Sequence, residues 1–418
     1  MSVFVVSKSP ALSGNVKISG AKNGALPILA ASILTDEECV ISSVPPLKDV
    51  FVMIDILKKL GADIDYDEKK EKVTVCCKNI GTWEEDSDDA SKLRASFIIM
   101  GPLLARMKKA RIPLPGGCQI GSRPVDLHLK GFQAMGATIE QKMGFISAKT
   151  KKLIGDTIYL DFPSVGATEN IMMAAALASG VTVIENAAAE PEICDLAKFL
   201  CKMGAKVTGA GTDTIKIEGS EKLKGAKHKV IPDRIEAGTF MVASAITGGD
   251  IILENVISEH LKPVTAKLAE SNVLIEELEG NKMRVAANEK LKPINIKTMP
   301  FPGFPTDMQS QFMSLSAVIS GTSIITETVF ENRFIYAGEL RRMGADIKID
   351  SRSAVIEGVK KLTGTQVRAT DLRGGAALIL SALAAEGETE ISDIYHIERG
   401  YCNIEKKFES LGAFIKKI

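Results

Sequence analysis

The sequence predicts an α/β protein made of six repeated modules, and the first observation behind this is a recurring helix end. A large apolar residue, a Gly-Ala pair and a strand-like run occur together five times, at Leu60-Gly61-Ala62, Met135-Gly136-Ala137, Met203-Gly204-Ala205, Met343-Gly344-Ala345 and Leu411-Gly412-Ala413. Asn272 stands at the equivalent place of a sixth copy, because asparagine can adopt the left-handed backbone conformation that glycine provides elsewhere. These six positions are 68 to 75 residues apart, which is too regular for chance.

The second observation is an earlier helix start in every module, 36 to 42 residues before this helix end. The starts are polar or contain glycine, and lie at Gly24, Arg94, Gly166, Glu236, Asp307 and Arg373. Segments 171–178 and 376–385 are apolar almost all round. Such helices are typical of a protein interior, between sheets and other helices.

The third observation is a set of β-branched segments after these helices, at 181–184, 250–253 and 322–326, which predict strands. Each module is therefore a mixed unit of helices and strands, roughly 70 residues long. That length exceeds the usual repeat of a solenoid, so the pattern favours two domains of three modules each.

Composition restricts the possible partners. The 418 residues are 45% hydrophobic and 25% charged, with 52 Lys+Arg against 52 Asp+Glu, so general attraction to nucleic acid or to an anionic membrane is not supported. The seven cysteines include no CxxC pair, which fits neither a disulfide framework nor a zinc site. The chain starts without a signal-peptide pattern and its apolar runs are too short to span a membrane, so we expect a cytoplasmic protein.

Three helix starts carry cations, Lys22, Arg94 and Arg373. Positive charge is unfavourable at a helix N-terminus unless an anion lies nearby, so the repeated pattern predicts a polyanionic ligand held by cations and backbone N–H groups. For any single start an ordinary cap is the simpler interpretation, and Asp307 and Ser164 suit that role.

The loop from Pro115 to Pro124 combines a thiol, Cys118, with a guanidinium, Arg123, and three glycines. Glycine permits unusual backbone conformations, and proline stiffens the ends of the loop. Taken locally, the segment is either a reactive lid or a surface loop with an incidental cysteine.

At this point the chain resembles the bacterial UDP-N-acetylglucosamine enolpyruvyl transferases (1-carboxyvinyltransferases). The resemblance covers the whole chain and is carried by the motifs at 20–23, 118–128, 164–170, 305–309, 331–333, 371–373 and 399–401. It implies two inverted α/β barrel domains of three modules each, as in EPSP synthase, with the active site in the cleft between them. The domains implied are residues 22–230, and residues 1–21 together with 231–418.

The resemblance also implies a reaction. The enzyme adds the sugar 3'-hydroxyl to C2 of phosphoenolpyruvate, protonates C3 to form a tetrahedral ketal, and then loses phosphate. Its substrates are phosphoenolpyruvate and UDP-N-acetylglucosamine, with no cofactor and no metal. This is the first committed step of peptidoglycan synthesis, linked to cell-wall biogenesis, cell shape and cell division, and we expect a monomer or weak homo-oligomer.

The resemblance assigns chemistry to several residues. Cys118 is the general acid or assists product release, and is the expected target of fosfomycin. Asp307 is the general base. Lys22, Arg123 and Arg399 bind phosphate, with Lys22 and Arg399 counted as catalytic; Arg333 and Arg373 lie nearer the carboxylate of phosphoenolpyruvate or the closing domain. Arg94 and Asp371 complete the substrate-binding set.

The nucleotide sugar is expected to use a further group of residues. Arg123, Pro124, Val125, Asp126, Leu127 and His128 surround the uracil, while Ser164, Val165 and Gly166 meet the diphosphate. Asn23 and Asp307 contact the sugar, and Val329 and Phe330 the nucleotide. His128 is a structural or loop residue in this interpretation, without acid or base function. Phe162 stands where some family members have lysine, which removes one cation from the expected diphosphate site.

Two other functions remain open. One is 5-enolpyruvylshikimate-3-phosphate synthase, with the same architecture and donor, against which the cysteine loop and its Arg123–His128 continuation argue. The other is a non-catalytic sensor of UDP-sugars, against which the joint presence of Lys22, Cys118, Asp307 and Arg399 argues.

Overall fold

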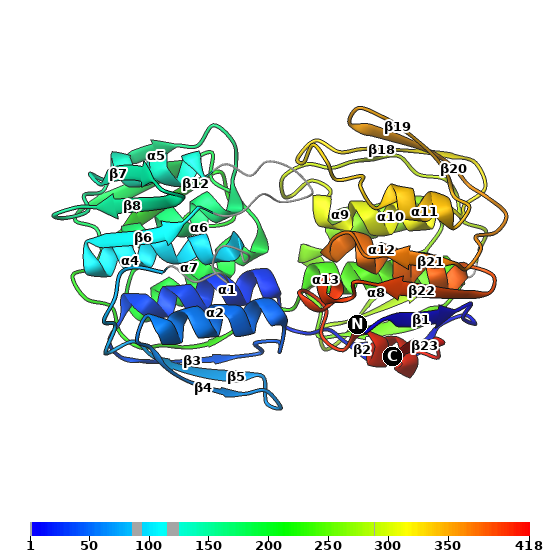
Figure 1. Ribbon diagram of the computed structural model, residues 1–418, viewed down its shortest axis with the longest axis horizontal. Helices are drawn as coiled ribbons and strands as arrows, with labels where there is room; N and C mark the ends of the chain where they lie inside the picture. Colours follow the sequence, from blue (N-terminus) through cyan, green and yellow to red (C-terminus); the bar gives the residue numbers. More distant parts are fainter. Residues whose placement is uncertain (1, 86–93, 115–124, 288) are drawn as a thin grey trace. The chain divides into compact units, whose positions relative to one another are not determined.

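The computed structural model describes residues 2–85, 94–114, 125–287 and 289–418, with the backbone alone at positions 94 and 95. Its described residues fall into two compact units. The contiguous unit lies between Gly20 and Ile231, and the split unit combines residues 2–19 with Pro232–Ile418. Each unit contains three sheets flanked by helices (Figure 1).

The contiguous unit contains three modules of similar order. The elements of the first are α1 (Lys22–Ala31), η1 (Ser32–Leu34), β3 (Glu38–Ser42), α2 (Lys48–Lys59), β4 (Asp63–Asp67), β5 (Lys72–Cys76) and, from far along the chain, β13 (Lys227–Lys229). Those of the second are η2 (Arg94–Ile99), α4 (Met100–Met107), β6 (Lys109–Pro113), α5 (Asp126–Ala134), β7 (Thr138–Lys142) and β8 (Phe145–Lys149). The third has β9 (Thr157–Tyr159), α6 (Val165–Ala175), β10 (Val181–Glu185), α7 (Pro191–Met203), β11 (Lys206–Thr208) and β12 (Thr214–Glu218).

The split unit repeats this order. Its first module has β2 (Ser13–Lys17), α8 (Arg234–Thr247), β14 (Asp250–Glu254), η3 (Ser258–His260), α9 (Lys262–Glu270), β15 (Leu274–Leu278) and β16 (Lys282–Ala286). The next has β17 (Ile296–Lys297), η4 (Thr306–Met308), α10 (Gln309–Ser316), β18 (Thr322–Thr326), α11 (Ala337–Arg342), β19 (Asp346–Asp350) and β20 (Ser353–Glu357). The last has β21 (Gln366–Arg368), α12 (Leu372–Ala384), β22 (Glu388–Ser392), α13 (Tyr395–Glu398), α14 (Ile404–Ser410), β23 (Ile415–Lys417) and β1 (Phe4–Ser7).

The sheets share one topology. In the order β17-β18-β20-β19, the first pair is parallel and the others antiparallel, and the four other four-stranded sheets follow the same pattern. The sheet of the second module has three strands, β6-β8-β7, and a parallel bridge between Glu84 and Arg111 takes the place of the fourth. In the last module β1 lies between β22 and β23, with Phe4 opposite Ile391 and Lys417.

The predicted helix ends are confirmed as left-handed positions. The φ angles are 105°, 89°, 108°, 94° and 90° at Gly61, Gly136, Gly204, Gly344 and Gly412, and 70° at Asn272. Asparagine tolerates this conformation better than other side chains, because its short polar group can hydrogen-bond locally. The six-module repeat is therefore present in the backbone itself, and the predicted α/β class is confirmed.

Three inner helices form the centre of each unit. In the split unit they are α8, α10 and α12 (Figure 1). Every residue of α12 from Arg373 to Leu383 is buried, as its nearly all-apolar sequence predicts. In the contiguous unit the inner helices are α1, α4 and α6, and η2 contacts all three. A Cβ on Gly101 of α4 would lie 2.2 Å from the backbone oxygen of Asn170, so only glycine permits this approach to α6.

The chain passes between the units at Ser19–Gly20 and again at Ile231–Pro232. At each crossing, a buried carboxylate accepts a hydrogen bond from the backbone of the last residue before the crossing. Glu236 accepts a hydrogen bond from Ser19 N at 2.7 Å in the split unit, and Asp195 accepts one from Ile231 N at 3.2 Å in the contiguous unit. The last residue before each crossing is therefore hydrogen-bonded to a helix of its own unit, Ser19 to α8 and Ile231 to α7.

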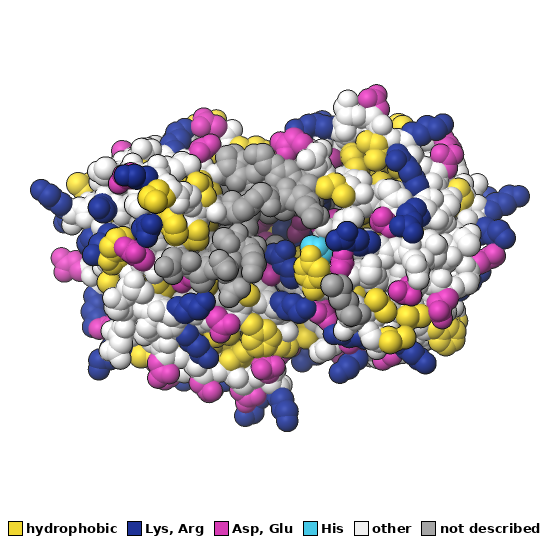
Figure 2. All heavy atoms as spheres, viewed as in Figure 1, with side chains coloured by type: hydrophobic (Ala, Val, Ile, Leu, Met, Phe, Trp, Pro, Cys, Tyr) yellow, Lys and Arg dark blue, Asp and Glu magenta, His cyan; other side chains and the backbone are white. Residues whose placement is uncertain are grey.

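The visible surface mixes basic and acidic side chains within each unit, in keeping with the equal numbers of each (Figure 2). Among the helices that the structure describes, none combines the length and hydrophobicity needed to cross a membrane.

Candidate active-site residues

Asp307 lies at the start of an inner helix, between two arginines. Arg333 Nη2 donates to Oδ1 at 2.9 Å, and Arg373 Nη2 donates to Oδ2 at 3.0 Å. The two arginines are only 2% and 3% exposed. Neither η4 nor α10 has a side-chain cap at its N-terminus, so Asp307 is bound as the partner of two guanidiniums, and the alternative of a simple helix cap does not describe it.

Arg373 retains donors beyond this ion pair. Its Nε and Nη1 are buried and have no hydrogen-bond partner among the described residues. Burial lowers the pKa of the guanidinium, but the attractions of Asp307, Tyr401 and Asp233 together outweigh it and the net shift is upward. A buried, permanently charged group with unused donors is suited to bind an anion such as a carboxylate or phosphate.

Asp371 has a structural function at the start of α12. Its Oδ1 accepts hydrogen bonds from the backbone N of Arg373 and of Gly374, both at 3.0 Å, so it caps the helix. This cap fixes the first turn, which carries Arg373. The half-buried Arg399 follows α13, and its charge adds to burial in lowering the pKa of His396.

Val329 and Phe330 follow β18 in the same unit. Their backbone N–H groups donate to Glu327 Oε1 at 2.8 and 3.1 Å. The Phe330 ring lies 5.5 Å from the guanidinium carbon of Arg333. The split unit therefore brings together five of the predicted residues, Asp307, Val329, Phe330, Arg333 and Arg373.

In the contiguous unit, Lys22 begins α1 and its Nζ lies 3.1 Å from Asp49 Oδ2 in the first turn of α2. Both side chains are buried, and Asn23 beside them is exposed. Lys22 and Arg373 are thus each paired with a carboxylate of the protein itself. Their charge at a helix start is compensated there, and the charge mismatch alone does not require a polyanionic ligand.

The residues expected around the nucleotide lie on α5 and α6. Val125 precedes α5, which begins with Asp126, Leu127 and His128. His128 is buried; its Nδ1 lies 3.0 Å from Asn170 Nδ2, and a Cβ on Gly166 would be 3.3 Å from its ring. Ser164 caps α6 by accepting from Ala167 N, with Val165 next in the first turn. Phe162 is 44% exposed just before this helix.

Four predicted residues fall wholly or partly outside the described part of the chain. Cys118, Arg123 and Pro124 lie outside the described residues, and for Arg94 only the backbone, at the start of η2, is described.

Comparison with known proteins identifies the family. The sequence profile of the EPSP synthase (3-phosphoshikimate 1-carboxyvinyltransferase) family matches residues 6–408. A protein of Caldanaerobacter subterraneus subsp. tengcongensis, named UDP-N-acetylglucosamine 1-carboxyvinyltransferase 1, is 59% identical over 99% of this chain and 98% of its own length. One from Clostridium tetani, named UDP-N-acetylglucosamine 1-carboxyvinyltransferase 2, is 57% identical over the full length of both.

The chain is a member of the UDP-N-acetylglucosamine 1-carboxyvinyltransferase family. Its fold agrees with solved structures: the enolpyruvyl transferase NikO from Streptomyces tendae matches with a TM-score of 0.90 at 25% identity, over 100% of this chain and 98% of that one. EPSP synthase from Acinetobacter baumannii matches with a TM-score of 0.75 at 19% identity, over the full length of both chains, and shares the fold. The expected EPSP synthase-like architecture is therefore confirmed.

Two residues of this carboxyvinyltransferase family member belong to the described clusters but did not follow from sequence motifs. Asp49 is the partner of Lys22, and Glu327 binds the backbone of Val329 and Phe330. Asp49 carries no local signal beyond its place in the first turn of a helix. Glu327 offers a weak one, because a carboxylate directly after a buried strand is a common position for a functional group.

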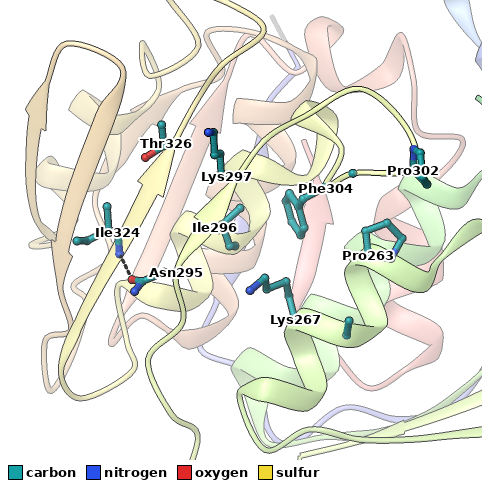
Figure 3. A pocket seen from close by; sticks show the side chains of 11 residues that line it. Pro263, Lys267, Asn295, Ile296, Lys297, Pro302, Phe304, Ile324 and Thr326 are labelled. Atoms are coloured by element: carbon teal, nitrogen blue, oxygen red, sulfur yellow. Dashed lines mark hydrogen bonds between the residues drawn. The ribbon is translucent and has the colours of Figure 1, made fainter. Parts of the chain in front are cut away.

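A surface cavity of about 520 Å³ lies elsewhere on the split unit, between α9 and the β17–β18 edge of a sheet. Figure 3 shows Lys267 and Pro263 on α9, Lys297 on β17 and Phe304 around it, with Asn295 accepting a hydrogen bond from Ile324 N at 2.9 Å. None of the predicted site residues lines this cavity.

Proposed function

We propose that the protein transfers the enolpyruvyl group of phosphoenolpyruvate to the 3'-hydroxyl of UDP-N-acetylglucosamine and releases phosphate. The observation that carries the proposal is Asp307, held between two buried guanidiniums of which one keeps unused donors. A carboxylate base beside fixed cations is what addition of a hydroxyl to an anionic enol ester requires. Full-length relatives of 57% and 59% identity carry the matching name.

In the first step, the sugar oxygen bonds to C2 of phosphoenolpyruvate, its proton goes to Asp307, and the Cys118 thiol donates a proton to C3. The product is a tetrahedral ketal. In the second step, the bond from C2 to the phosphate oxygen breaks, C3 returns a proton to the Cys118 thiolate, and the departing phosphate takes the proton held by Asp307, which leaves an enolpyruvyl ether and phosphate. Lys22, Arg123 and Arg399 neutralise the phosphate, and Arg333 and Arg373 bind the carboxylate.

The carboxylate of phosphoenolpyruvate would compete with Asp307 for Arg333 and Arg373, which both donate to Asp307 in the structure. Arg94, with the residues of α5 and the start of α6 named above, would bind the nucleotide sugar together with Asn23, Val329 and Phe330.

A phosphate-release assay with purified protein tests the proposal. We expect release only when phosphoenolpyruvate and UDP-N-acetylglucosamine are both present, and none with shikimate 3-phosphate in place of the nucleotide sugar. Release with shikimate 3-phosphate would assign the EPSP synthase reaction, and tight UDP-sugar binding without turnover would assign a sensor.

The wider assignments follow from this reaction. The two structural units would be the two three-module domains, the product would enter peptidoglycan synthesis and so affect cell shape and division, and the protein would act in the cytoplasm as a monomer or weak homo-oligomer. Fosfomycin would inactivate it by alkylating Cys118.

A further inference from the structure

Glu327 is a buried carboxylate. It follows β18, is 1% exposed, and has no ion-pair partner among the described residues. Removing a carboxylate from water is costly unless hydrogen bonds replace the lost hydration. Four groups donate hydrogen bonds to its two oxygens. Hydrogen bonds to a charged acceptor are strong, so they constrain the segments that carry these donors.

Two donors of Oε1 belong to the segment after β18, and a third, Thr298, follows β17. The backbone N–H groups of Val329 and Phe330 lie 2.8 and 3.1 Å from this oxygen, and the hydroxyl of Thr298 lies 2.9 Å away. Thr298 in turn accepts a hydrogen bond from Thr328 N at 2.9 Å. This half of the carboxylate fixes the backbone of the two residues assigned to the nucleotide.

The other oxygen reaches the segment that carries the proposed base. Thr306 Oγ1 donates to Glu327 Oε2 at 2.8 Å, and Thr306 directly precedes Asp307 in η4. One rigid carboxylate thus joins two segments that are separated by about 20 positions in sequence and that both belong to the proposed active site.

We propose that Glu327 is a positioning residue that sets the placement of the Asp307 carboxylate relative to the Val329–Phe330 backbone. This deepens the proposed function and rests on it, since the importance of that placement comes from Asp307 acting as base and Val329 and Phe330 meeting the nucleotide sugar. General-base catalysis depends steeply on distance, so a small shift of Asp307 lowers turnover more than it lowers binding.

Thr306 allows the Oε2 contact to be removed alone. Thr306→Val keeps the shape of the side chain but has no hydroxyl, and we expect its kcat to fall by roughly tenfold to a hundredfold while the KM for UDP-N-acetylglucosamine stays within about twofold. Thr306→Ser restores the hydroxyl and is expected to recover most of the activity. Thr322→Val is the matched control, because Thr322 donates to Glu357 at 2.7 Å on the exposed face of the same sheet.

Glu327→Gln weakens both contacts at once. We expect a fall in kcat together with a rise in the KM for UDP-N-acetylglucosamine. Hydrogen exchange followed by mass spectrometry gives a readout that does not depend on turnover: the amides of Val329 and Phe330 should exchange at least about tenfold faster than in the unmodified protein, while those of β14 should not change.

Three results would overturn the positioning role: wild-type kcat in Thr306→Val, equal impairment of Thr306→Val and Thr306→Ser, or unchanged exchange at Val329 and Phe330 in Glu327→Gln. Failure of the proposed function looks different. In that case the unmodified protein releases no phosphate from the two substrates, while the exchange experiment still reports whether Glu327 holds the segment.

Discussion

At the scale of single residues, the arrangement of Asp307 makes a direct prediction for Asp307→Asn. The amide keeps an oxygen acceptor but loses the charge, so kcat should fall by roughly a hundredfold to ten-thousandfold if the carboxylate is the base. The variant should also be less stable, because Arg333 and Arg373 lose the carboxylate that offsets their burial.

Steady-state phosphate release and thermal unfolding would be measured on the same preparation of Asp307→Asn. Binding of UDP-N-acetylglucosamine by calorimetry separates lost chemistry from lost structure. Turnover within about twofold of the unmodified protein would rule out the base function.

Cysteine reactivity gives a second prediction at this scale. Burial raises the pKa of the Cys77 thiol to about 12, so almost none of it is thiolate at pH 8, and Cys77 should resist alkylation in the folded protein. Peptide mass spectrometry after fosfomycin treatment should find the adduct on Cys118, with Cys77 as an internal control. An inactivated enzyme with an unmodified Cys118 peptide would contradict the assignment.

At the scale of elements, the inner helix α6 carries an unusual group, Glu169. The residue is buried, and its Oε1 has no hydrogen-bond partner among the described residues. Burial, and then the charges of Glu192 and Glu190, raise the pKa of this carboxyl well above its ordinary value of 4.5. The native protein therefore binds a proton at pH values where the unfolded chain has released it, and stability falls as pH rises above 4.5.

Glu169→Gln removes the carboxyl group and with it this loss of stability at higher pH. We expect the variant to gain stability relative to the unmodified protein between pH 5 and pH 8, as measured by urea unfolding at several pH values. Glu185→Gln, at an exposed position at the end of β10, controls for the general loss of one carboxylate. Parallel stability curves for Glu169→Gln and the unmodified protein would show that Glu169 is not responsible.

Some features of the elements could be predicted from the sequence, and contacts between distant elements could not. The six helix ends were predictable, because a left-handed residue is a local backbone property that glycine or asparagine signals directly. The pair formed by Lys22 and Asp49 was not, since it joins two helices by a contact across 27 positions. Glu327 was missed for the same reason: its donors come from three segments, and its place directly after a strand is only a weak local signal.

At the scale of the whole molecule, the two units differ in which parts of the chain form their sheets. All strands of the three sheets in the contiguous unit come from residues 20–231. The split unit needs β1 inside one sheet and β2 at the edge of another. Neither strand could be assigned to its sheet from sequence patterns, because β1 pairs with β22 across nearly the whole chain and β2 pairs with β14 across more than half of it. It was the resemblance to a family, and no local pattern, that implied a domain of residues 1–21 together with 231–418.

A fragment of residues 20–231 should therefore unfold cooperatively by itself, whereas residues 232–418 should not fold without the first 19. Joining residues 2–19 behind residue 418 through a short linker should restore folding, because Val3 and Ile418 already exchange backbone hydrogen bonds at 2.9 and 3.0 Å. Circular dichroism and denaturant titration of the three chains would test this. Equal stability of residues 232–418 with and without the added strands would contradict it.

The position of β1 also has a consequence for synthesis of the protein. Phe4 and Val6 are fully buried between β22 and β23 once the fold is complete, yet both partner strands leave the ribosome only after nearly all other residues. The contiguous unit can finish folding during translation, while β1 stays unpaired until β22 and β23 have been made. The split unit contains the first strands to be translated, and it is the last to complete its sheets.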